Sequence, residues 1–317
     1  MTVVEFRPVT ECWVCGHAHL RRVHRARLEL SIYATQDSEL AAYSNHDIWI
    51  QRCRACGFAQ PAELPALPGF FGRMYDQRWS KDWVEREFES DSKKEIFARV
   101  LTGLERRLPD ECRDLLDVGA HVGKFIETAR ARGWRAEGIE LNPTTADYAR
   151  RRTGATIHDC DLATLSARTP APRFDAVTLT DVLEHIPAPL DTLRSAAQVI
   201  RPGGWIAVKV PCGPNQLLKE RLRVLLRRVE RVSVADNLVH VGHFTPRSLA
   251  RALERCGFDG IQIEPGLPEW CELPRASTRV ALNAIRRVSW VAATVLPLRS
   301  PLTFNLQAFA RRKEIGA

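Results

Sequence analysis

The chain has 317 residues, 45% of them hydrophobic and 26% charged, and a formal net charge of +8. This length and composition exclude a wholly disordered chain and allow one large domain and one small one. The N-terminus lacks the basic-then-apolar pattern of a signal peptide, and the most apolar late stretch, 288–296, is too short to cross a bilayer. We therefore expect a cytoplasmic protein.

Two cysteine pairs, in the motifs CWVCG and CRACG, lie near the N-terminus. The two-residue gap lets both sulfurs of a pair reach one ion, and the glycine relaxes the turn behind them. We predict one structural zinc ion with the ligands Cys12, Cys15, Cys53 and Cys56. The scattered remaining cysteines are expected to be small buried hydrophobes: Cys112, Cys160, Cys212, Cys256 and Cys271.

Residues 1–65 are predicted to form a zinc ribbon with short strands at 27–33 and 48–52. His17, His19 and His24 are expected at the surface, because the four cysteines already complete a tetrahedral ligand set. Basic residues in this segment form no tract with interleaved aromatics. The pattern therefore favours a structural clip over a nucleic-acid module.

A linker follows the ribbon, because Pro61, Pro65, Pro68 and Gly69 interrupt regular structure. We place a domain boundary near residue 65. Residues 66–110 then contain an aromatic-rich stretch and a helical run.

The stretch 115–130, LLDVGAHVGKFIETAR, reads as a strand, a tight loop and a helix. Gly119 and Gly123 allow a sharp turn and a close approach of a ligand to main-chain N–H groups, and Asp117 lies at the carboxyl end of the strand. A dinucleotide fingerprint needs glycine where this chain has His121. A phosphate-free adenosyl ligand therefore fits better than NAD.

Glu140 ends the next strand-like run, about 20 residues beyond the loop, where a carboxylate can accept ribose hydroxyls. The remaining pattern alternates as in a doubly wound α/β sheet, which we place in a domain of residues 111–317. The seven predicted strands are 114–118, 135–141, 156–158, 176–180, 205–210, 261–264 and 303–310, with helices beginning near Lys124, Pro143, Pro189, Gln216 and Pro246.

With Asp117, Glu140 and the later segments FDAVTLTDVLEHI and IRPGGWIAVKVP, residues 114–265 resemble the class I S-adenosylmethionine-dependent methyltransferases. The resemblance implies a Rossmann-like seven-stranded sheet whose last strand inserts antiparallel, a methyltransferase activity and S-adenosyl-L-methionine as cofactor. The cofactor-binding residues that it implies are Asp117, Gly119, His121, Gly123, Glu140, Leu141, Asp161 and Asp181. Asp159 is the alternative to Asp161 at the adenine.

Asp181, Glu184 and His185, at the end of the fourth strand, are the most chemically versatile cluster in the chain. We predict Asp181, His185 and His243 as catalytic residues, with His185 or His243 as the base if the acceptor is a hydroxyl or an acidic carbon. Glu184 and His185 could instead form a structural polar pair. His243 could line the acceptor pocket, together with His240, or lie in an exposed loop.

Three further features leave alternatives open. Tyr75 and Trp79 either cover the cofactor, as a helix does at this point in the resembled family, or pack the ribbon onto the main domain. The basic amphipathic helix 216–232 is a core-packing helix, a phosphate- or carboxylate-binding lid, or a surface for acidic lipid. A second inserted helix, 278–296, suits a lid or an oligomer contact.

We expect methyl transfer to an anionic small-molecule acceptor such as a sugar, a glycolipid or a secondary metabolite. An RNA methyltransferase that uses the ribbon and the basic helix is the first alternative, although TDVLEH differs from the Asn/Asp-Pro-Pro-aromatic signature of amino-group base methylases. A non-catalytic binding protein with this fold is the second. Peripheral membrane contact is compatible with the basic helix, and the pattern leaves the oligomeric state open.

Overall fold

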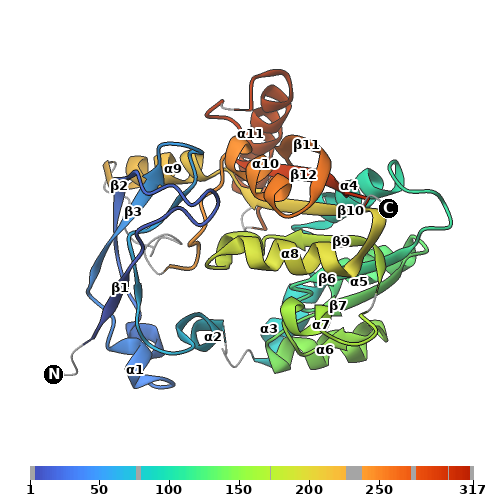
Figure 1. Cartoon of the computed structure of the whole chain (residues 1–317), viewed down its shortest axis with the longest axis horizontal. Helices are drawn as coiled ribbons and strands as arrows, with labels where there is room; N and C mark the ends of the chain where they lie inside the picture. The colour runs from blue at the N-terminus through green and yellow to red at the C-terminus, as the bar shows by residue number, and fades with distance from the viewer. Residues whose placement is uncertain are drawn as a thin grey trace. The chain divides into compact units, whose positions relative to one another are not determined.

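A computed structural model describes residues 4–75, 80–171, 173–225, 238–272, 276–298 and 300–314. The chain divides into two compact units (Figure 1). The first, here the ribbon unit, comprises Met1–Gln77, Glu184–Pro189 and Pro211–Arg251. The second, the sheet unit, comprises Arg78–Leu183, Leu190–Val210 and Ala252–Ala317.

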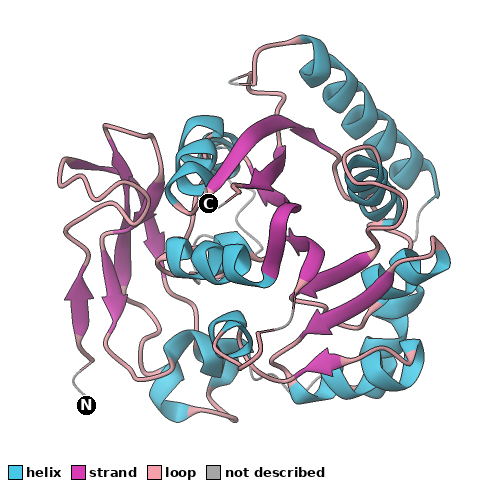
Figure 2. Ribbon diagram, turned by 45° about the vertical axis from the view of Figure 1, so that its right-hand side comes forward, coloured by secondary structure: helices cyan, strands magenta, loops and turns pink. Residues whose placement is uncertain are grey.

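The sheet unit contains a seven-stranded sheet in the order β11-β12-β10-β9-β6-β7-β8, with helices on its two faces (Figure 2). Its strands are β6 (Asp114–Val118), β7 (Arg135–Ile139), β8 (Ile157–His158), β9 (Phe174–Thr180), β10 (Ile200–Pro211), β11 (Phe258–Gly266) and β12 (Asn305–Arg312). The accompanying helices are α3 (Lys81–Glu89), α4 (Lys94–Glu105), α5 (Lys124–Ala131), α6 (Pro143–Thr153), α7 (Leu162–Ser166), α8 (Pro189–Val199) and α11 (Ala276–Val295). Helix α10 (Pro246–Arg255) begins in the ribbon unit, and its last residues belong to the sheet unit.

Strand direction places several carboxyl ends at one edge of this sheet. β6 pairs in parallel with β7 and with β9, so that Val118 faces Ile139 on one side and Leu179 on the other. β10 pairs in parallel with β9. β12 lies between β10 and β11 and runs antiparallel to β11. The predicted doubly wound, Rossmann-like sheet is confirmed.

The strands of the sheet unit were predictable from the sequence because their residues lie in its buried core. β9 is buried along nearly its whole length, as is expected for a parallel strand covered on both faces. Packing is close where α4 meets β12, because a Cβ at Gly103 would lie 2.2 Å from the Phe309 ring. Glycine is therefore the residue that fits between this helix and the sheet.

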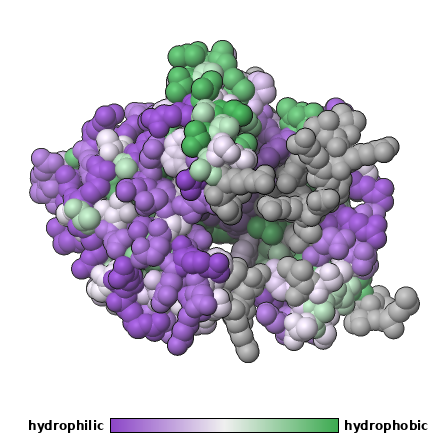
Figure 3. All heavy atoms as spheres, turned by 180° about the vertical axis from the view of Figure 1, so that it is seen from behind, coloured by the Kyte–Doolittle hydropathy of each residue, from purple (hydrophilic) through white to green (hydrophobic). Residues whose placement is uncertain are grey.

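Helix α11 carries an exposed apolar face. Val280, Ile285, Val288 and Val295 are 61–82% exposed, and Figure 3 shows hydrophobic atoms gathered at the end of the molecule where Figure 1 places α11. Within the described residues, none of the helices combines the length and apolarity needed to span a bilayer.

The ribbon unit is built on two small sheets. β2 (Leu20–Arg27), β3 (Asp47–Cys53) and β4 (Ala59–Pro61) form an antiparallel sheet, and β1 (Phe6–Pro8) pairs with β5 (Glu63–Pro65). Short helices follow these strands: η1 (Ser31–Tyr33), α1 (Ser38–Ala41), α2 (Phe70–Tyr75), η2 (Leu183–His185, which begins one residue before the unit) and α9 (Gly213–Leu225).

One predicted ribbon strand is wrong. The strand expected at 48–52 lies within β3, but the other is β2, which ends at Arg27, and 31–33 form a 3-10 helix. Leu28, Leu30 and Tyr33 produced the misleading alternation. Their side chains are buried in one apolar cluster at the end of the hairpin instead of on one face of a strand.

The predicted basic helix is described only in part. α9 begins at Gly213, and the predicted residues beyond Leu225 lie outside the described part of the chain. Leu217 is buried, whereas Leu218 and Leu222, two apolar residues of the predicted amphipathic helix, are 42% and 47% exposed.

Candidate cofactor site, cysteine cluster and histidine cluster

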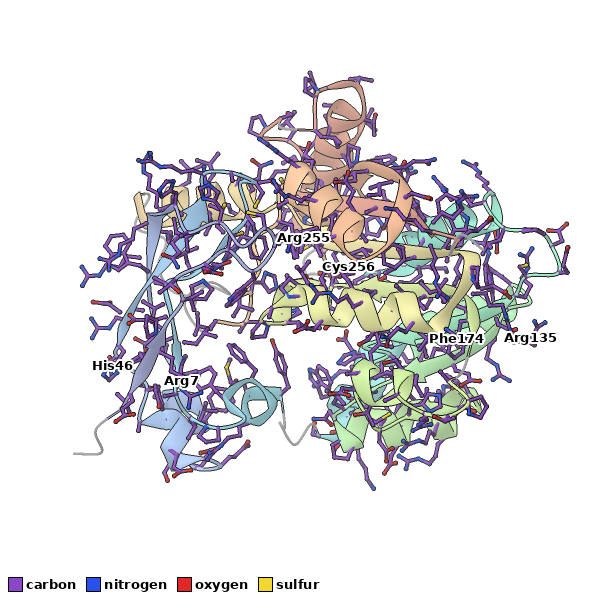
Figure 4. All side chains as sticks on the ribbon, viewed as in Figure 1. Arg7, His46, Arg135, Phe174, Arg255 and Cys256 are labelled. Atoms are coloured by element: carbon purple, nitrogen blue, oxygen red, sulfur yellow. The ribbon has the colours of Figure 1, made fainter. Side chains whose placement is uncertain are left out.

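The loop after β6 turns through three residues with left-handed backbone. Gly119, His121 and Gly123 have φ values of 77°, 51° and 85°. A Cβ at Gly119 would lie 2.6 Å from a Val182 methyl, and one at Gly123 would lie 3.0 Å from Ala149. Both glycines are therefore required by conformation and by space. The loop opens at the sheet edge opposite Arg135 and Phe174, which begin β7 and β9 and are labelled in Figure 4.

Glu140 fixes this loop. One carboxylate oxygen accepts from the His121 N–H at 2.7 Å and the other from the Asn142 N–H at 2.8 Å. Burial raises the pKa of Glu140, although these hydrogen bonds oppose the rise. A carboxylate oxygen can accept more than one hydrogen bond, so ribose hydroxyls can also bind. Leu141, beside it, is 64% exposed.

His121 contributes an uncharged ring to the loop. The centroids of the His121 and Trp83 rings lie 5.4 Å apart in an edge-to-face arrangement. Burial lowers the pKa of His121 to about 4. The imidazole is therefore neutral at pH 7 and places no positive charge against the sulfonium of the expected cofactor.

Asp117 is a buried carboxyl, 4% exposed, that accepts a 2.6 Å hydrogen bond from the Thr178 hydroxyl. Burial raises the pKa of Asp117 to about 7, and the nearby charge of Glu140 acts in the same direction. Its placement at the end of β6 agrees with the expected position. Its main observed contact, however, is to the neighbouring strand β9.

Asp161 caps α7 by accepting from the Thr164 N–H at 2.7 Å, and this hydrogen bonding lowers its pKa. The side chain of Asp159, the alternative adenine ligand, is 82% exposed and lies 3.9 Å from Arg150. The cap gives Asp161 a structural role besides the predicted one.

Asp181 forms ion pairs with two lysines that the sequence pattern did not indicate. Lys209 Nζ lies 2.5 Å from one carboxylate oxygen, and Lys93 Nζ lies 3.4 Å from the other. Burial alone would raise the pKa of Asp181, but the two lysine charges outweigh it and lower the pKa to about 2. Asp181 is thus a fixed anion and a poor proton acceptor at neutral pH. Lys209 could have been noticed as the one charge in the buried run IAVKVP.

The cysteine tetrad comes together as predicted. The Sγ atoms of Cys12 and Cys56 lie 3.5 Å apart, as do those of Cys15 and Cys53, and all four are within 4.8 Å of one another. Tetrahedral zinc with Zn–S bonds of about 2.3 Å separates its sulfurs by roughly 3.8 Å, so the cluster can hold this ion.

The knuckle turns have the expected backbone, because Gly16 and Gly57 adopt φ values of 73° and 82°. Of the five other cysteines, Cys212 and Cys256 are buried as predicted. The prediction is wrong for Cys112, Cys160 and Cys271, which lie in loops and are partly exposed.

A second polar cluster lies in the ribbon unit. The candidate ligand atoms of Glu184, His185 and His240 are within 4.8 Å of one another, and the His185 and His240 rings meet edge-on at 4.7 Å. Tyr75 lies beside them, with its hydroxyl 2.9 Å from His185 Nδ1. The partner that was predicted with Tyr75, Trp79, lies outside the described residues.

His243 is 1% exposed, so the alternative of an exposed loop histidine is wrong. Its Nδ1 lies 3.3 Å from the Gln216 amide oxygen, and burial lowers the pKa of His243 to about 4. The Gln216 amide nitrogen lies 2.6 Å from His240 Nδ1. Gln216 therefore bridges the two histidines, a role that the sequence pattern did not indicate.

Comparison with known families gives a match to more than half of the chain. The sequence profile of a family described as "Methyltransferase domain" matches residues 81–263.

Several curated relatives carry one functional name. The ubiquinone biosynthesis O-methyltransferase of Chromobacterium violaceum is 30% identical over 39% of this chain and 55% of its own length. The protein of that name from Aromatoleum aromaticum is 30% identical over 65% of this chain and 85% of its own. The chain thus spans about half the length of some relatives that it matches and most of another.

Two solved structures share the fold. One is a complex between the Trm112 methyltransferase activator of Haloferax volcanii and a methyltransferase, with a TM-score of 0.51, 14% identity and coverage of 75% of this chain and all of that one. The other is phosphoethanolamine N-methyltransferase 2 of Haemonchus contortus with S-adenosyl-L-methionine, with a TM-score of 0.51, 15% identity and coverage of 93% and 68%.

Proposed function

The chain belongs to the methyltransferase domain family of S-adenosylmethionine-dependent enzymes, and from this premise we propose that it transfers a methyl group to a hydroxyl oxygen of a small-molecule acceptor. The proposal rests mainly on the glycine loop at the carboxyl ends of β6 and β7, which is hydrogen-bonded to Glu140 through the His121 N–H. The oxygen acceptor is supported by the relatives that are named O-methyltransferases.

For the cofactor, we propose that Glu140 binds the ribose hydroxyls. The adenine is expected to lie beside Asp161 and Leu141. The ability of carboxylate oxygens to accept more than one hydrogen bond supports the first assignment. The exposed apolar surface of Leu141 supports the second. We place Asp181, as a permanent anion, beside the methionine portion of the cofactor. Asp117 supports the loop from within the sheet and need not touch the ligand.

The reaction itself requires alignment more than activation. The acceptor oxygen attacks the methyl carbon as the carbon–sulfur bond breaks, S-adenosylhomocysteine leaves, and the hydroxyl proton passes to a base. Asp181, with a pKa of about 2, is a poor candidate for that base. His185 and His243 are the proposed alternatives, and His243 is neutral at pH 7 because burial lowers its pKa to about 4.

An anionic acceptor remains part of the proposal and rests on the sequence alone. The net charge of +8 and the arginines of residues 216–232 favour it, since guanidinium groups bind phosphate and carboxylate bidentately.

Calorimetry with S-adenosyl-L-methionine tests the cofactor site. Glu140→Ala should weaken binding by about 3 kcal/mol, or on the order of a hundredfold, because two hydrogen bonds to a charged group are lost. The matched control is Asp147→Ala, which removes an exposed carboxylate of the same unit and should leave affinity unchanged. Equal affinities for Glu140→Ala and the unaltered protein would contradict this placement.

Release of S-adenosylhomocysteine tests the acceptor class. The proposal expects turnover with phenolic or sugar hydroxyl compounds, faster when they carry a phosphate or carboxylate, and none with RNA transcripts. Turnover with RNA alone would favour the nucleic-acid alternative, and cofactor binding without any turnover would favour a binding protein. His185→Ala or His243→Ala should lower turnover by on the order of a hundredfold with little change in cofactor affinity.

A further inference from the structure

Glu184, His185 and His240 present a carboxylate and two imidazoles within 4.8 Å of one another. We propose that these three residues form a second metal site, separate from the cysteine tetrad, that binds one divalent cation of the zinc type. The inference goes beyond methyl transfer, and a cation bound to His185 would leave His243 as the proposed base. It stands on three features of the ribbon unit.

The first feature is the orientation of His185. Its Nδ1–H donates to the Val239 carbonyl oxygen at 2.6 Å, and the Tyr75 hydroxyl donates to the same oxygen at 3.2 Å. A proton on Nδ1 leaves the lone pair on Nε2. Metal-binding histidines commonly donate their other N–H to a backbone carbonyl in this way, which fixes the ring and its tautomer.

The second feature is the pairing of His240 with Gln216. The amide lies 2.6 Å from His240 Nδ1, while its oxygen lies 3.3 Å from His243 Nδ1. A half-turn of the amide lets its oxygen accept a hydrogen bond from the His240 Nδ1–H and its nitrogen donate one to His243 Nδ1. Gln216 can therefore support the His240 tautomer that offers Nε2 to a metal, with both hydrogen bonds retained.

The third feature is a backbone clamp between the two segments that carry the ligands. The Glu184 carbonyl oxygen accepts from the N–H groups of Val241 and Gly242 at 2.9 and 2.8 Å. A Cβ at Gly242 would lie 3.4 Å from the Glu184 Cα, so the segments pack closely. Glu184 and His185 are thus held against the loop of His240 before any cation binds.

The ligand set indicates the cation. Two imidazoles and one carboxylate suit zinc, with three protein ligands and one position left for water or another oxygen ligand. Magnesium prefers an oxygen environment and strict octahedral geometry, which two histidines do not supply. Glu184 is 1% exposed, and opposite charges attract each other more strongly in such a buried setting than in water.

Zinc stoichiometry of the full-length protein tests the proposal. The unaltered protein should bind two zinc ions per chain, and titration calorimetry with ZnCl₂ should resolve the weaker one. His240→Ala should retain the first ion and lower affinity for the second by a hundredfold or more, because even a residue that only supports a ligand is commonly worth ten- to a hundredfold. Glu184→Gln, which keeps the shape of the side chain, should do the same.

His19→Ala is the matched control, since it removes an exposed histidine of the same unit and should leave both ions bound. Cobalt substitution provides a second readout. The first cobalt should show thiolate charge-transfer absorption, and the second should not. One zinc per chain in the unaltered protein, or a second ion that survives both His240→Ala and Glu184→Gln, would overturn the proposal. Methyl transfer itself is measured separately, by the release of S-adenosylhomocysteine.

Discussion

Ala59 and His243 exchange two backbone hydrogen bonds, from the Ala59 N–H at 3.1 Å and from the His243 N–H at 2.8 Å. The second cysteine knuckle lies directly before Ala59, and the Thr245 hydroxyl donates to the Cys56 carbonyl at 3.2 Å. The Phe58 and Phe244 rings add a contact at 4.8 Å. The HVGHF segment, residues 240–244, is therefore held against the second cysteine knuckle by these contacts. A metal in the tetrad would stabilise the histidine cluster through this backbone pairing.

Loss of one tetrad cysteine should remove the structural zinc and destabilise the ribbon unit. For Cys53→Ser we expect no tightly bound ion at this site and a loss of roughly 4 kcal/mol when free zinc exceeds its Kd a thousandfold. Metal analysis and thermal unfolding measure the two effects. Cys160→Ser, a partly exposed cysteine outside the tetrad, is the control. A Cys53→Ser protein with full zinc content and unchanged unfolding would count against the site.

Asp117 should make stability fall as pH rises from about 4 to about 7. Its pKa is raised to about 7 in the folded chain, against 3.8 for the ordinary group, so the folded state binds more protons across this interval. The stabilising proton is present below pH 4 and lost as pH passes 7. Asp117→Asn should remove this dependence and raise stability at pH 8 by up to about 4 kcal/mol.

Chemical denaturation of both proteins at pH 5 and pH 8 checks this expectation. The difference between them should be about 2 kcal/mol at pH 5 and about 4 kcal/mol at pH 8. Asp159→Asn, at an exposed carboxylate, serves as the control and should follow the unaltered protein at both values. A variant that is less stable than the unaltered protein at pH 8 would show that the Asp117 charge is stabilising, contrary to the burial argument.

The ion pairs of Asp181 should be worth more than those at the surface. Lys209 is 3% exposed, and Lys209→Met leaves the carboxylate with Lys93 alone. Breaking such a buried pair costs about 3 kcal/mol or more. Asp181→Asn combined with Lys209→Met should recover much of the loss, because no charge is then left uncompensated.

A double-mutant cycle in urea measures this coupling. Lys94→Met, which removes an exposed ion pair with Asp91, is the control and should cost less than about 1 kcal/mol. If Lys209→Met costs no more than this control, the lysine is not needed to hold Asp181.

The local pattern was sufficient where the structure depends on neighbours in the chain. β6 and the start of α5 lie at the predicted residues, because the apolar run, the glycines and the helical spacing all occur within 16 residues of sequence. The cysteine tetrad also came from spacing within each knuckle. Glu140 was found at the end of its strand for the same reason.

Contacts between distant segments could not be read in this way. Thr245 and Cys56 are 189 residues apart, and Asp181 and Lys209 are 28 apart. No period or spacing links such pairs, so the bridge from Ala59 to His243 and the lysines around Asp181 were missed. Gln216 was overlooked because a glutamine at the start of a helix has an ordinary surface role in most sequences.

Gly213 should control the position of His243. A Cβ at Gly213 would lie 2.6 Å from the His243 carbonyl carbon, which is backbone and has little room to move. Gly213→Ala should therefore push the HVGHF segment away from α9, strain its pairing with Ala59 and cost about 1–3 kcal/mol, as overpacking commonly does. Thermal unfolding measures the loss, and zinc titration should show weaker binding at the Glu184–His185–His240 cluster.

Gly72→Ala is the matched control in the same unit. It lies in α2 with nothing within 4 Å of the added Cβ, so the helix should gain about 0.5–1 kcal/mol from the change. Changes in stability of opposite sign for the two glycine substitutions would support close packing of α9 against the HVGHF segment. A Gly213→Ala protein as stable as Gly72→Ala, with unchanged zinc affinity, would mean that this packing does not position His243.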